Sequence, residues 1–428
     1  MVSAGTPAVH TPRTFGWRQW PVMSVALVAL GAGFGQFGAV AALGSVAKTF
    51  GHLTHGASFA DEVGLSGTML GVGLAVLRLA SLGGLLLSGL ADRLGRRPML
   101  FGTLAVGLVL TVAASASPSY WWFVVIFALG RPLLSATTGV AQVAAVELTS
   151  SNDRARAVAL VAAGYAVGAG LTAVIHSLGA RSLGFRGVFA LAVVPLVALP
   201  LLSRRLVEPD RFAMLAEAEH RQPVLGPVAR GLRGRLVLVA MLAFAISVVT
   251  GPANSLVFIY AQNLLHVSGV VTSIMVVAAG AVGLGGLLAG RWLADNIGRR
   301  PTVAISIVGM SVFGTLAYTG STPALLVGYV LGVAAGAVFA PAGGALANEL
   351  FPTAVRASVA GWYIAAGVLG AVVGLLEFGV LADVGSVGNH AGFAAALTFL
   401  PMMPVALLLL ALPETRGREL DATVPHQA

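Results

Sequence analysis

The sequence predicts an all-α polytopic membrane protein, in which twelve transmembrane helices form two pseudo-symmetric six-helix bundles. Three observations predict this fold class: an apolar composition, twelve long apolar segments, and a charged turn that occurs twice. Hydrophobic residues make up 57% of the 428 residues and charged residues only 10%, whereas an ordinary soluble domain has about 25% charged residues. A soluble core does not absorb this many apolar segments of about 20 residues, each long enough to cross a bilayer.

The apolar segments fall into two groups of six. The longest polar stretch of the chain separates the groups, and Pro223 and Pro227 within it break any long helix. The expected domains are a cytoplasmic tail at 1–20, an N-terminal half at 21–203, a cytoplasmic linker at 204–235, a C-terminal half at 236–412 and a cytoplasmic tail at 413–428. The expected spans are 21–47, 65–90, 99–118, 121–147, 155–179, 187–203, 236–262, 268–293, 301–320, 324–348, 355–382 and 391–412.

The distribution of basic residues orients the chain. Of the 25 Lys and Arg residues, 20 lie in every second loop counted from the N-terminal tail, three lie in the opposite loops, and two lie within apolar segments. Cytoplasmic loops of membrane proteins carry the excess of Lys and Arg. The sequence therefore predicts a multi-pass protein of the cell membrane with both termini and the linker in the cytoplasm.

Composition also argues against several other classes of protein. The chain has no Cys, which excludes disulfides, thiolate metal ligands and a Cys nucleophile. The net charge of +9 does not indicate nucleic-acid binding, because Lys48 is the only lysine and no basic run with interleaved aromatic residues occurs. The sequence has no His/Asp/Glu metal spacing, no Gly-x-Ser-x-Gly and no phosphate loop. We therefore expect no metal, no cofactor and no enzymatic activity.

The charged turn that occurs twice indicates an internal repeat. Leu90–Pro98 reads LADRLGRRP and Leu293–Pro301 reads LADNIGRRP, at an offset of 203 residues. A Glu followed seven positions later by an Arg also recurs, at an offset of 202 residues. Two charge patterns at one spacing indicate a six-helix unit used twice in parallel, the architecture of carriers whose halves rock about a central site. The Glu–Arg pairs are Glu147 with Arg154 and Glu349 with Arg356.

The first turn resembles the signature loop of the major facilitator superfamily, Gly-x-x-Asp-Arg-x-Gly-Arg-Arg. The second copy departs from this pattern at Trp292 and Asn296. Leu412–Leu420, LPETRGREL, is similar to the closing segment of sugar-porter-like and metabolite-symporter-like members, and Val207–Phe212, VEPDRF, is a weaker echo of it. The residues that carry the resemblance are Gly89, Asp92, Arg93, Gly95, Arg96 and Arg97, and in the second copy Asp295, Gly298, Arg299 and Arg300.

The resemblance implies that these charges act at a cytoplasmic gate. In this superfamily the carboxylate equivalent to Asp92 docks near a helix N-terminus of the other half, an arrangement that the helix dipole favours. Glu147 ends the fourth span, and we expect it to pair with Arg97 or Arg154. We interpret the set as a latch that stabilises the outward-facing state; the alternative is that the charges only set the topology. The second half repeats the set with Asp295, Arg300, Glu349 and Arg356.

Two arginines within apolar segments mark the candidate substrate site. Arg131 lies 16 residues before Glu147 and Arg78 lies 14 residues before Asp92, which places them about 24 and 21 Å along their helices. An intramembrane arginine is costly and by default marks a functional site, so we expect the two to bind an organic anion. The alternatives are that Arg78 reaches the outer headgroups and that Arg131 bonds backbone carbonyls loosened by Pro132.

The resemblance also implies that the first, fourth, seventh and tenth spans line the central cavity. Gln36 is the candidate of the first span. Gly251 and Pro252 are expected to break the seventh helix, and a broken polar helix is tolerated in a bilayer only where it faces protein or a wet cavity. Polar packing between helices is the alternative for these residues. The candidates of the seventh span are Thr250, Asn254, Ser255, Tyr260 and Gln262, with Asn254 and Gln262 the foremost substrate contacts.

Proton coupling has few candidate groups. Arg131 resembles the arginine that many proton-coupled members keep in the fourth span, but the first span lacks the Asp that sugar and aromatic-acid symporters often carry. His176 and Glu377 lie about 30 Å along their helices, and we expect each to be solvated near the outer face in preference to relaying protons.

Three functional hypotheses remain open at this point. The leading one is a secondary carrier that moves a small organic solute, an anion or metabolite, by alternating access, as a monomer and with or without a coupling proton. The second is a proton-coupled efflux antiporter for drugs or metabolites. The third, a polytopic enzyme or sensor, requires a catalytic cluster or an output domain that the sequence does not contain.

Overall fold

The computed structural model describes residues 14–54, 58–150, 153–179, 183–208, 225–226, 228–352, 355–384 and 389–416. Within these ranges every regular element is a helix, apart from a single bridge between Phe15 and Thr149. Twelve helical segments are long and apolar enough to cross a membrane. The prediction of an all-α protein with twelve spans is therefore confirmed. Most of the predicted linker lies outside the described residues.

The N-terminal half contains six spans, two of which consist of two helices. The second span is α4 and α5 and the sixth is α9 and α10; the first span is α1, and the short helices α2 and α3 follow it before the second span. The bounds are α1 (Trp20–Ala41), α2 (Leu43–Phe50), α3 (Phe59–Val63), α4 (Gly67–Ala80), α5 (Gly83–Leu94), α6 (Arg96–Ala114), α7 (Tyr120–Leu148), α8 (Arg154–Gly179), α9 (Gly184–Ala190) and α10 (Val193–Ser203).

The C-terminal half contains the other six spans. Its first span, α12, begins after the 3-10 turn η1 and ends in a π-helical turn, η2, and its last span continues from α17 into the 3-10 segment η4. The bounds are η1 (Arg230–Leu232), α12 (Arg233–Ile259), η2 (Tyr260–Leu264), α13 (Gly269–Asn296), α14 (Arg299–Ala317), α15 (Thr322–Glu349), α16 (Arg356–Val384), α17 (His390–Phe399) and η4 (Leu400–Ala411).

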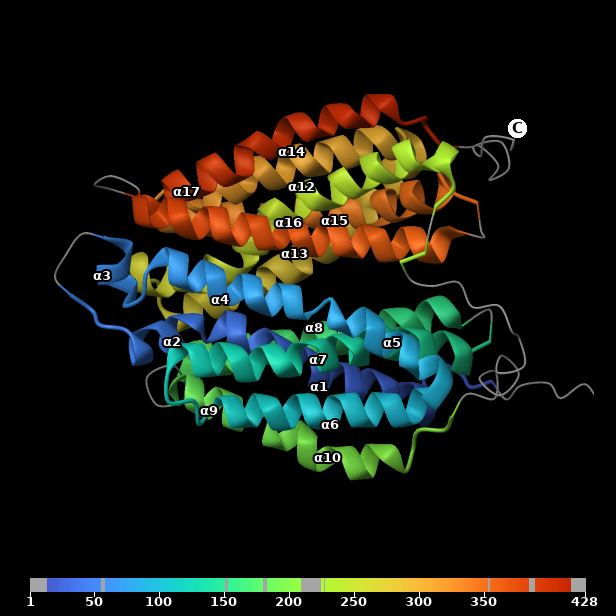
Figure 1. Cartoon of the computed structure of the whole chain (residues 1–428), viewed down its shortest axis with the longest axis horizontal. Coiled ribbons are helices and arrows are strands. Elements are labelled where there is room, and N and C mark those ends of the chain that lie inside the picture. The colour runs from blue at the N-terminus through green and yellow to red at the C-terminus, as the bar shows by residue number, and fades with distance from the viewer. Residues whose placement is uncertain are drawn as a thin grey trace, which may run out of the picture.

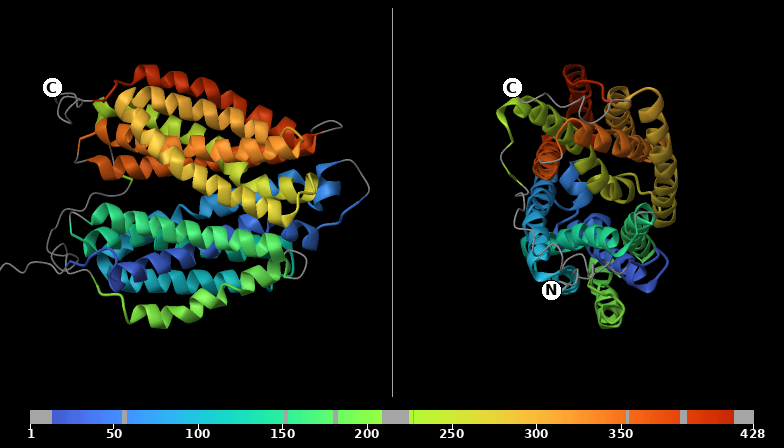
Figure 2. Two further views of the ribbon diagram at one scale, coloured as in Figure 1. Left: turned by 180° about the vertical axis from the view of Figure 1, so that it is seen from behind. Right: turned by 90° about the vertical axis from the view of Figure 1, so that its right-hand side faces the viewer.

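The two halves form two bundles that lie side by side along their length (Figure 1). Both charged turns lie at the end of the molecule where the described chain also begins and ends, and we name this the motif end; it is on the right in Figure 1. The opposite end, which holds α3 and the start of α17, is the far end. Between the halves, α4 packs against α16 and α8 packs against α13. Figure 2 shows the same two bundles from behind and from the motif end.

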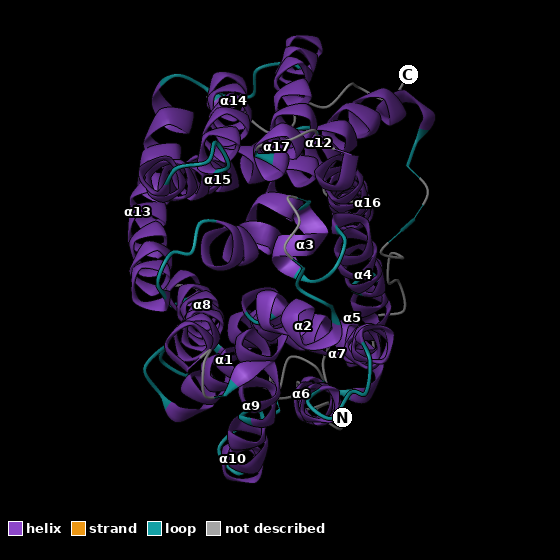
Figure 3. Ribbon diagram, turned by 90° about the vertical axis from the view of Figure 1, so that its left-hand side faces the viewer, coloured by secondary structure: helices purple, strands orange, loops and turns teal. Residues whose placement is uncertain are grey.

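Among the described residues, the buried core joins the two halves at one end. One cluster of buried residues contains members of both halves, including Phe59 and Tyr120 with Tyr260, Tyr318 and Phe378, and it lies at the far end. At the motif end each half has a separate cluster of its own. Viewed from the far end, α3 of the N-terminal half lies next to the C-terminal helices (Figure 3), and both α2 and α3 contact that half. The structure is therefore closed at the far end.

Helix starts at the two ends are capped differently. At the far end α4, α7, α13 and α15 each begin after a Ser whose hydroxyl accepts a backbone N–H of the first turn, the usual N-cap arrangement. At the motif end α6 and α14 begin after Gly95 and Gly298, which have no side chain to offer. Their first N–H groups need acceptors from elsewhere in the chain.

The seventh span differs from its expected form. Gly251 and Pro252 are expected to break this helix, but α12 is continuous from Arg233 to Ile259. The physical reason is close packing: a Cβ atom on Gly251 would lie 3.0 Å from the Cα atom of Ala371, so α16 lies directly against this turn. The departure from α-helical geometry comes later, in the π-helical turn Tyr260–Leu264.

Candidate functional site

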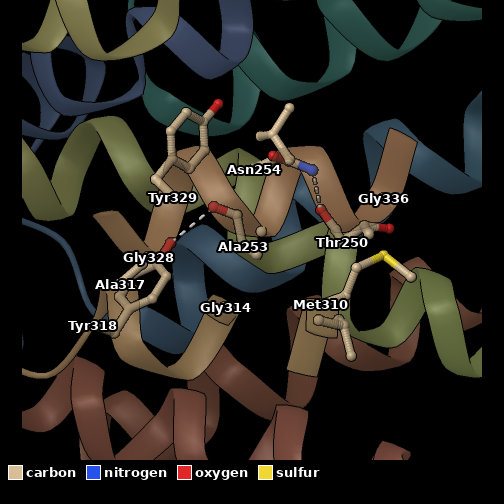
Figure 4. A pocket seen from close by; sticks show the side chains of 13 residues that line it. Thr250, Ala253, Asn254, Met310, Gly314, Ala317, Tyr318, Gly328, Tyr329 and Gly336 are labelled. Atoms are coloured by element: carbon tan, nitrogen blue, oxygen red, sulfur yellow. Dashed lines mark hydrogen bonds between the residues drawn. The ribbon is translucent and has the colours of Figure 1, made fainter. Parts of the chain in front are cut away.

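Three neighbouring cavities lie within and between the halves. The first, of about 410 Å³, lies between Arg78 on α4 and the helices α12 and α16 of the other half; we name it the inter-half cavity. The second, of about 300 Å³, lies among α12, α14 and α15 and is the C-half cavity (Figure 4). A third, much smaller cavity is lined by Gln36, Arg78, Arg131 and Ser255, among others. Arg78 lines the first and third cavities, and Thr250 and Asn254 line the first and second.

Arg131 is half-buried on α7 and directed to the smallest cavity. Its Nη1 donates a hydrogen bond to the backbone carbonyl of Gln36 at 3.0 Å, while its buried Nε has no partner. Among the described residues neither Arg131 nor Arg78 takes part in an ion pair. Two half-buried guanidinium groups thus share a cavity wall with no carboxylate to balance them.

Gln36 is fully engaged within the N-terminal half. Its Nε2 donates to the Leu134 carbonyl at 2.8 Å and to the Thr138 hydroxyl at 3.0 Å, and its Oε1 accepts from the Tyr165 hydroxyl at 3.5 Å. The residue is buried, with 6% of its surface exposed. The side chain of Gln36 therefore fixes α1 against α7 and α8. Its backbone carbonyl accepts the hydrogen bond that positions Arg131. This geometry suits a positioning residue better than a substrate contact.

Asn254 connects the two larger cavities. Its Nδ2 donates to the carbonyl of Thr250 at 3.0 Å, one turn earlier on α12, and its Oδ1 is directed away from Thr250 (Figure 4). Tyr318 is fixed by its hydroxyl, which donates to the Ala253 carbonyl at 3.0 Å. Tyr329 projects away from Tyr318 (Figure 4) and is half-buried. The C-half cavity is thus neutral, with aromatic, glycine and methionine walls and one amide.

Tyr260 and Gln262 lie outside these three cavities. The Tyr260 hydroxyl accepts the backbone N–H of Gly320 at 2.8 Å, and the ring packs on Tyr318 with centroids 4.7 Å apart. Gln262 Nε2 donates to the Ser177 hydroxyl at 3.2 Å, across the boundary between the halves. The sequence interpretation of these two residues as substrate contacts is not supported by their positions, because the π-helical turn brings them into the closed far end.

The far end is closed by a carboxylate of one half and a helix start of the other. Asp383, at the end of α16, accepts the backbone N–H groups of Gly67 and Thr68 at 2.6 and 2.8 Å. A carboxylate at a helix N-terminus is favoured by the helix dipole. The backbones are in direct contact here, since a Cβ atom on Gly71 would lie 2.5 Å from the Leu375 carbonyl oxygen. The sequence contained no local signal for this contact, because the partners are 316 residues apart.

The motif turns form ion pairs within each half. Glu147 pairs with Arg96, whose Nε and Nη2 donate at 3.0 and 2.8 Å, so the expected pairing with Arg97 or Arg154 is wrong. The reason is helical phase: Arg96 is the first residue of α6 and turns inward with 4% exposure, whereas Arg97 is exposed. In the C-terminal half Arg299 takes the same place, and its guanidinium donates to Asp295 at 3.0 Å and to Glu349 at 3.4 Å.

Two glutamates supply the acceptors that α6 and α14 require. Glu208 accepts the backbone N–H groups of Arg96 and Arg97 at 2.5 and 2.9 Å. Glu414 accepts those of Arg299 and Arg300 at 2.9 and 3.1 Å. Sequence reasoning did not place these glutamates in the site, although the segments VEPDRF and LPETRGREL that contain them were noticed. Gly95 and Gly298 have φ angles of 99° and 116°, a conformation that favours glycine and brings each carboxylate close to the helix start.

The other residues predicted for the cytoplasmic gate have varied surroundings. Asp92 lies in α5, but its side chain is outside the described part of the structure, as is any docking that it makes. Arg154 is half-buried, and its Nε has no hydrogen-bond partner. Gly89 is half-buried on α5 and Arg93 is exposed. Arg356 donates from Nε to the carbonyl of Phe351 at 3.1 Å.

His176 and Glu377, the two titratable residues near the far end, are less exposed to solvent than expected. His176 is buried, with 2% exposure, and its Nε2 lies 2.8 Å from the Ser45 hydroxyl, so the expectation that it is solvated is wrong. The close packing of α1 against α8 encloses it, and α2 contributes Ser45. Glu377 is half-buried on α16. Neither residue lines the three cavities described above.

Comparison with known proteins assigns a family to this geometry. The sequence model described as Major Facilitator Superfamily matches residues 25–293 and 281–425. The chain is 28% identical over 402 residues to the 3-(3-hydroxy-phenyl)propionate transporter of Escherichia coli K12, covering 90% of this chain and 92% of that one. It is 24% identical over 347 residues to the cis,cis-muconate transport protein of Acinetobacter baylyi, covering 76% and 80%. The structure superposes on the inward open conformation of the xylose transporter XylE from Escherichia coli with a TM-score of 0.72 and 20% identity, covering 94% and 98%.

Proposed function

Because the chain belongs to the major facilitator superfamily, we propose that it carries an organic acid anion across the membrane, with Arg131 and Arg78 binding the anionic group. It is a multi-pass membrane transporter of small organic solutes and not an enzyme. The observation that carries the anion proposal is the pair of half-buried arginines on cavity walls without an ion-pair partner among the described residues. An intramembrane charge is costly, and a residue that carries one by default marks a functional site.

The C-half cavity supports a second part of the proposal: it receives the neutral portion of the substrate. Its volume of about 300 Å³ exceeds the roughly 150 Å³ that suffices to bind benzene in an apolar site. Its lining contains no charged residue, so a second carboxylate would be unbalanced there. We therefore propose a monocarboxylate with a ring or other compact apolar group, whose polar substituents contact Asn254. The relative named for 3-(3-hydroxy-phenyl)propionate is consistent with this class.

Transport then follows from alternate opening of the two ends. The halves share a buried core at the far end and have separate cores at the motif end, and the excess of Arg in the loops at the motif end supports a cytoplasmic location for it. We propose that this conformation faces inward, that both termini are cytoplasmic, and that the protein acts as a monomer in the cell membrane. In the outward-facing state the motif ends approach, and Asp92 docks on the other half as a latch.

Coupling to a proton suits an anionic cargo. An inside-negative potential opposes uptake of one negative charge by about 2.3 kcal/mol per 100 mV. Symport of one carboxylate with one proton moves no net charge and removes this opposition. We propose electroneutral symport, which predicts that an inside-alkaline pH gradient drives uptake into proteoliposomes and that a membrane potential alone does not.

The test is a ligand screen on the purified protein in nanodiscs, read by thermal stabilisation and then by transport. Aromatic monocarboxylates should stabilise wild type but not Arg131→Ala. Gly332→Leu should fill the C-half cavity with little backbone strain, since the nearest atom to an added Cβ is 3.7 Å away, and should abolish binding of ring acids. Gly280→Leu, where nothing lies within 4 Å, is the matched control. Stabilisation confined to cations or neutral sugars would refute the proposal.

A further inference from the structure

An apolar groove lies on the N-terminal half, away from the substrate cavities. It has a volume of about 290 Å³ and lies among α1, α6, α8 and α10. Several of its walls are exposed, including Leu27, Leu171 and Val194, at 38%, 45% and 62%. In a membrane these exposed side chains face the lipid. The lining residues are Leu27, Leu30, Phe34, Leu104, Leu171, Ile175, Leu191, Val194, Pro195, Ala198, Leu199 and Leu202.

The groove has the length and direction of a lipid chain. On α1, Leu27 and Phe34 are seven residues apart and therefore share one face. On the α10 side the lining extends from Leu191 to Leu202, and eleven helical steps correspond to about 16 Å along the helix axis. The groove thus begins near the motif end of α10 and extends toward the middle of the bilayer, as an acyl chain does.

The groove residues of α1 and those of α10 lead to one opening at the motif end, which we name the mouth. Trp20 lies seven residues before Leu27 on the same face of α1, and it is 59% exposed. Arg205 lies one turn beyond Leu202, and its guanidinium is 5.8 Å from the centre of the Trp20 ring. Tryptophan prefers the boundary between the apolar bilayer core and the headgroups. The mouth is therefore at headgroup depth, with a tryptophan and an arginine in contact across it.

The mouth is positively charged. Arg204 and Arg205 are both exposed, and neither forms an ion pair with any residue that the structure describes. Glu208 is close in sequence, but its two oxygens accept the N–H groups of Arg96 and Arg97 at the start of α6. The two arginines are thus available to an anion from outside the protein.

We propose that this groove binds one acyl chain of an anionic phospholipid, whose phosphate lies at Arg204 and Arg205 beside Trp20. A zwitterionic lipid with the same chains obtains the apolar contact without the net charge attraction. A soluble phosphate obtains the charge attraction without the apolar contact. The site does not depend on the substrate proposal, because it shares no lining residue with the substrate cavities.

The experiment measures thermal stability of the full-length protein in detergent while lipid is added. Phosphatidylglycerol should stabilise wild type at about a tenfold lower concentration than phosphatidylcholine with identical chains, because each basic residue near an anionic headgroup strengthens binding several-fold. Glycerol 3-phosphate, which has no chains, should not stabilise it. The double variant Arg204→Gln, Arg205→Gln should lose the preference for phosphatidylglycerol, and Arg230→Gln, an exposed arginine at the same end, should keep it.

A second variant tests the groove itself. Ala198→Trp places a ring in the groove and should weaken stabilisation by both lipids, whereas Leu201→Trp on the same helix, exposed and outside the groove, should not. Equal stabilisation of wild type by the two lipids, or a preference that persists in the double arginine variant, would overturn the proposal. Stabilisation by glycerol 3-phosphate alone, or an Ala198→Trp variant that binds like Leu201→Trp, would do the same.

Discussion

The two halves of the molecule repeat one another at the motif end and differ at the cavities. Arg96 and Glu147 in one half correspond to Arg299 and Glu349 in the other, and each half caps its motif helix with a glutamate. The cavities show no such correspondence: the N-terminal half contributes two arginines, and the C-terminal half contributes neutral aromatic and amide groups. We propose that the shared residues serve the conformational change that both halves undergo, and that the unshared ones recognise the substrate.

The largest expected effect concerns the two repeated ion pairs, which differ in burial. The Arg96 and Glu147 side chains are 5% and 11% exposed, against 16% and 23% for Arg299 and Glu349. Removing one partner of a buried pair costs about 3 kcal/mol or more, and a fully exposed pair contributes about 1 kcal/mol or less. Glu147→Ala should therefore lower the free energy of unfolding by about 3 kcal/mol, and Glu349→Ala, in a half-buried pair between these limits, by about 1–2 kcal/mol. Chemical denaturation in detergent measures both; equal losses would show that the halves do not differ in this way.

An intermediate effect is expected where the halves meet at the far end. Asp383→Ala removes two charge-assisted hydrogen bonds to the start of α4 and should destabilise the far-end contact by about 2 kcal/mol. The population should shift toward a conformation with separated far ends. Spin labels on Ala116→Cys and Thr319→Cys report the distance between the far ends of the two halves, and the chain has no native Cys to remove. A distance distribution identical to that of the parent would exclude a role for Asp383 in closure.

The smallest expected effect concerns the cap of α14. Burial alone would raise the pKa of Glu414, but the N–H groups of Arg299, Arg416, Arg300 and Thr415 together lower it below its ordinary value. A carboxylate with a depressed pKa stabilises the fold above its unfolded pKa and loses that contribution as pH falls through the folded pKa. The melting temperature of Glu414→Gln should thus be lower than that of wild type at pH 6 to 7, by the few degrees that about 1 kcal/mol produces.

The pH dependence provides the control for this cap. The difference between wild type and Glu414→Gln should begin to shrink as the pH falls below about 4.3, the ordinary pKa of a glutamate in the unfolded state, and should disappear only when the pH has fallen through the lowered pKa of the folded state. A difference that is constant over pH 7 to 3.5 would show that the charge of Glu414 does not contribute.

The sequence was sufficient for the spans, the repeat and the two cavity arginines, because each has a signal in composition or spacing. It was not sufficient for the partner of Glu147, since the choice between Arg96 and Arg97 depends on a rotation of about 100° at the first turn of α6. Neither could it place Asp383, whose partners Gly67 and Thr68 are distant in the chain. Gln36 was found as a polar residue, but its hydrogen bonds depend on how α7 and α8 pack around it.

The central claim is that charge recognition belongs to the N-terminal half and recognition of the neutral portion to the C-terminal half. The most direct measurement is the ratio of dissociation constants for an aromatic monocarboxylate and its uncharged amide, by calorimetry in nanodiscs. Wild type should prefer the acid by about 30- to 100-fold, which corresponds to about 2–3 kcal/mol for a charged hydrogen-bonded contact. Arg131→Ala should bring the ratio near one, and Asn254→Ala should weaken both ligands while keeping the ratio. A ratio unchanged in Arg131→Ala, or lost in Asn254→Ala, would contradict the account.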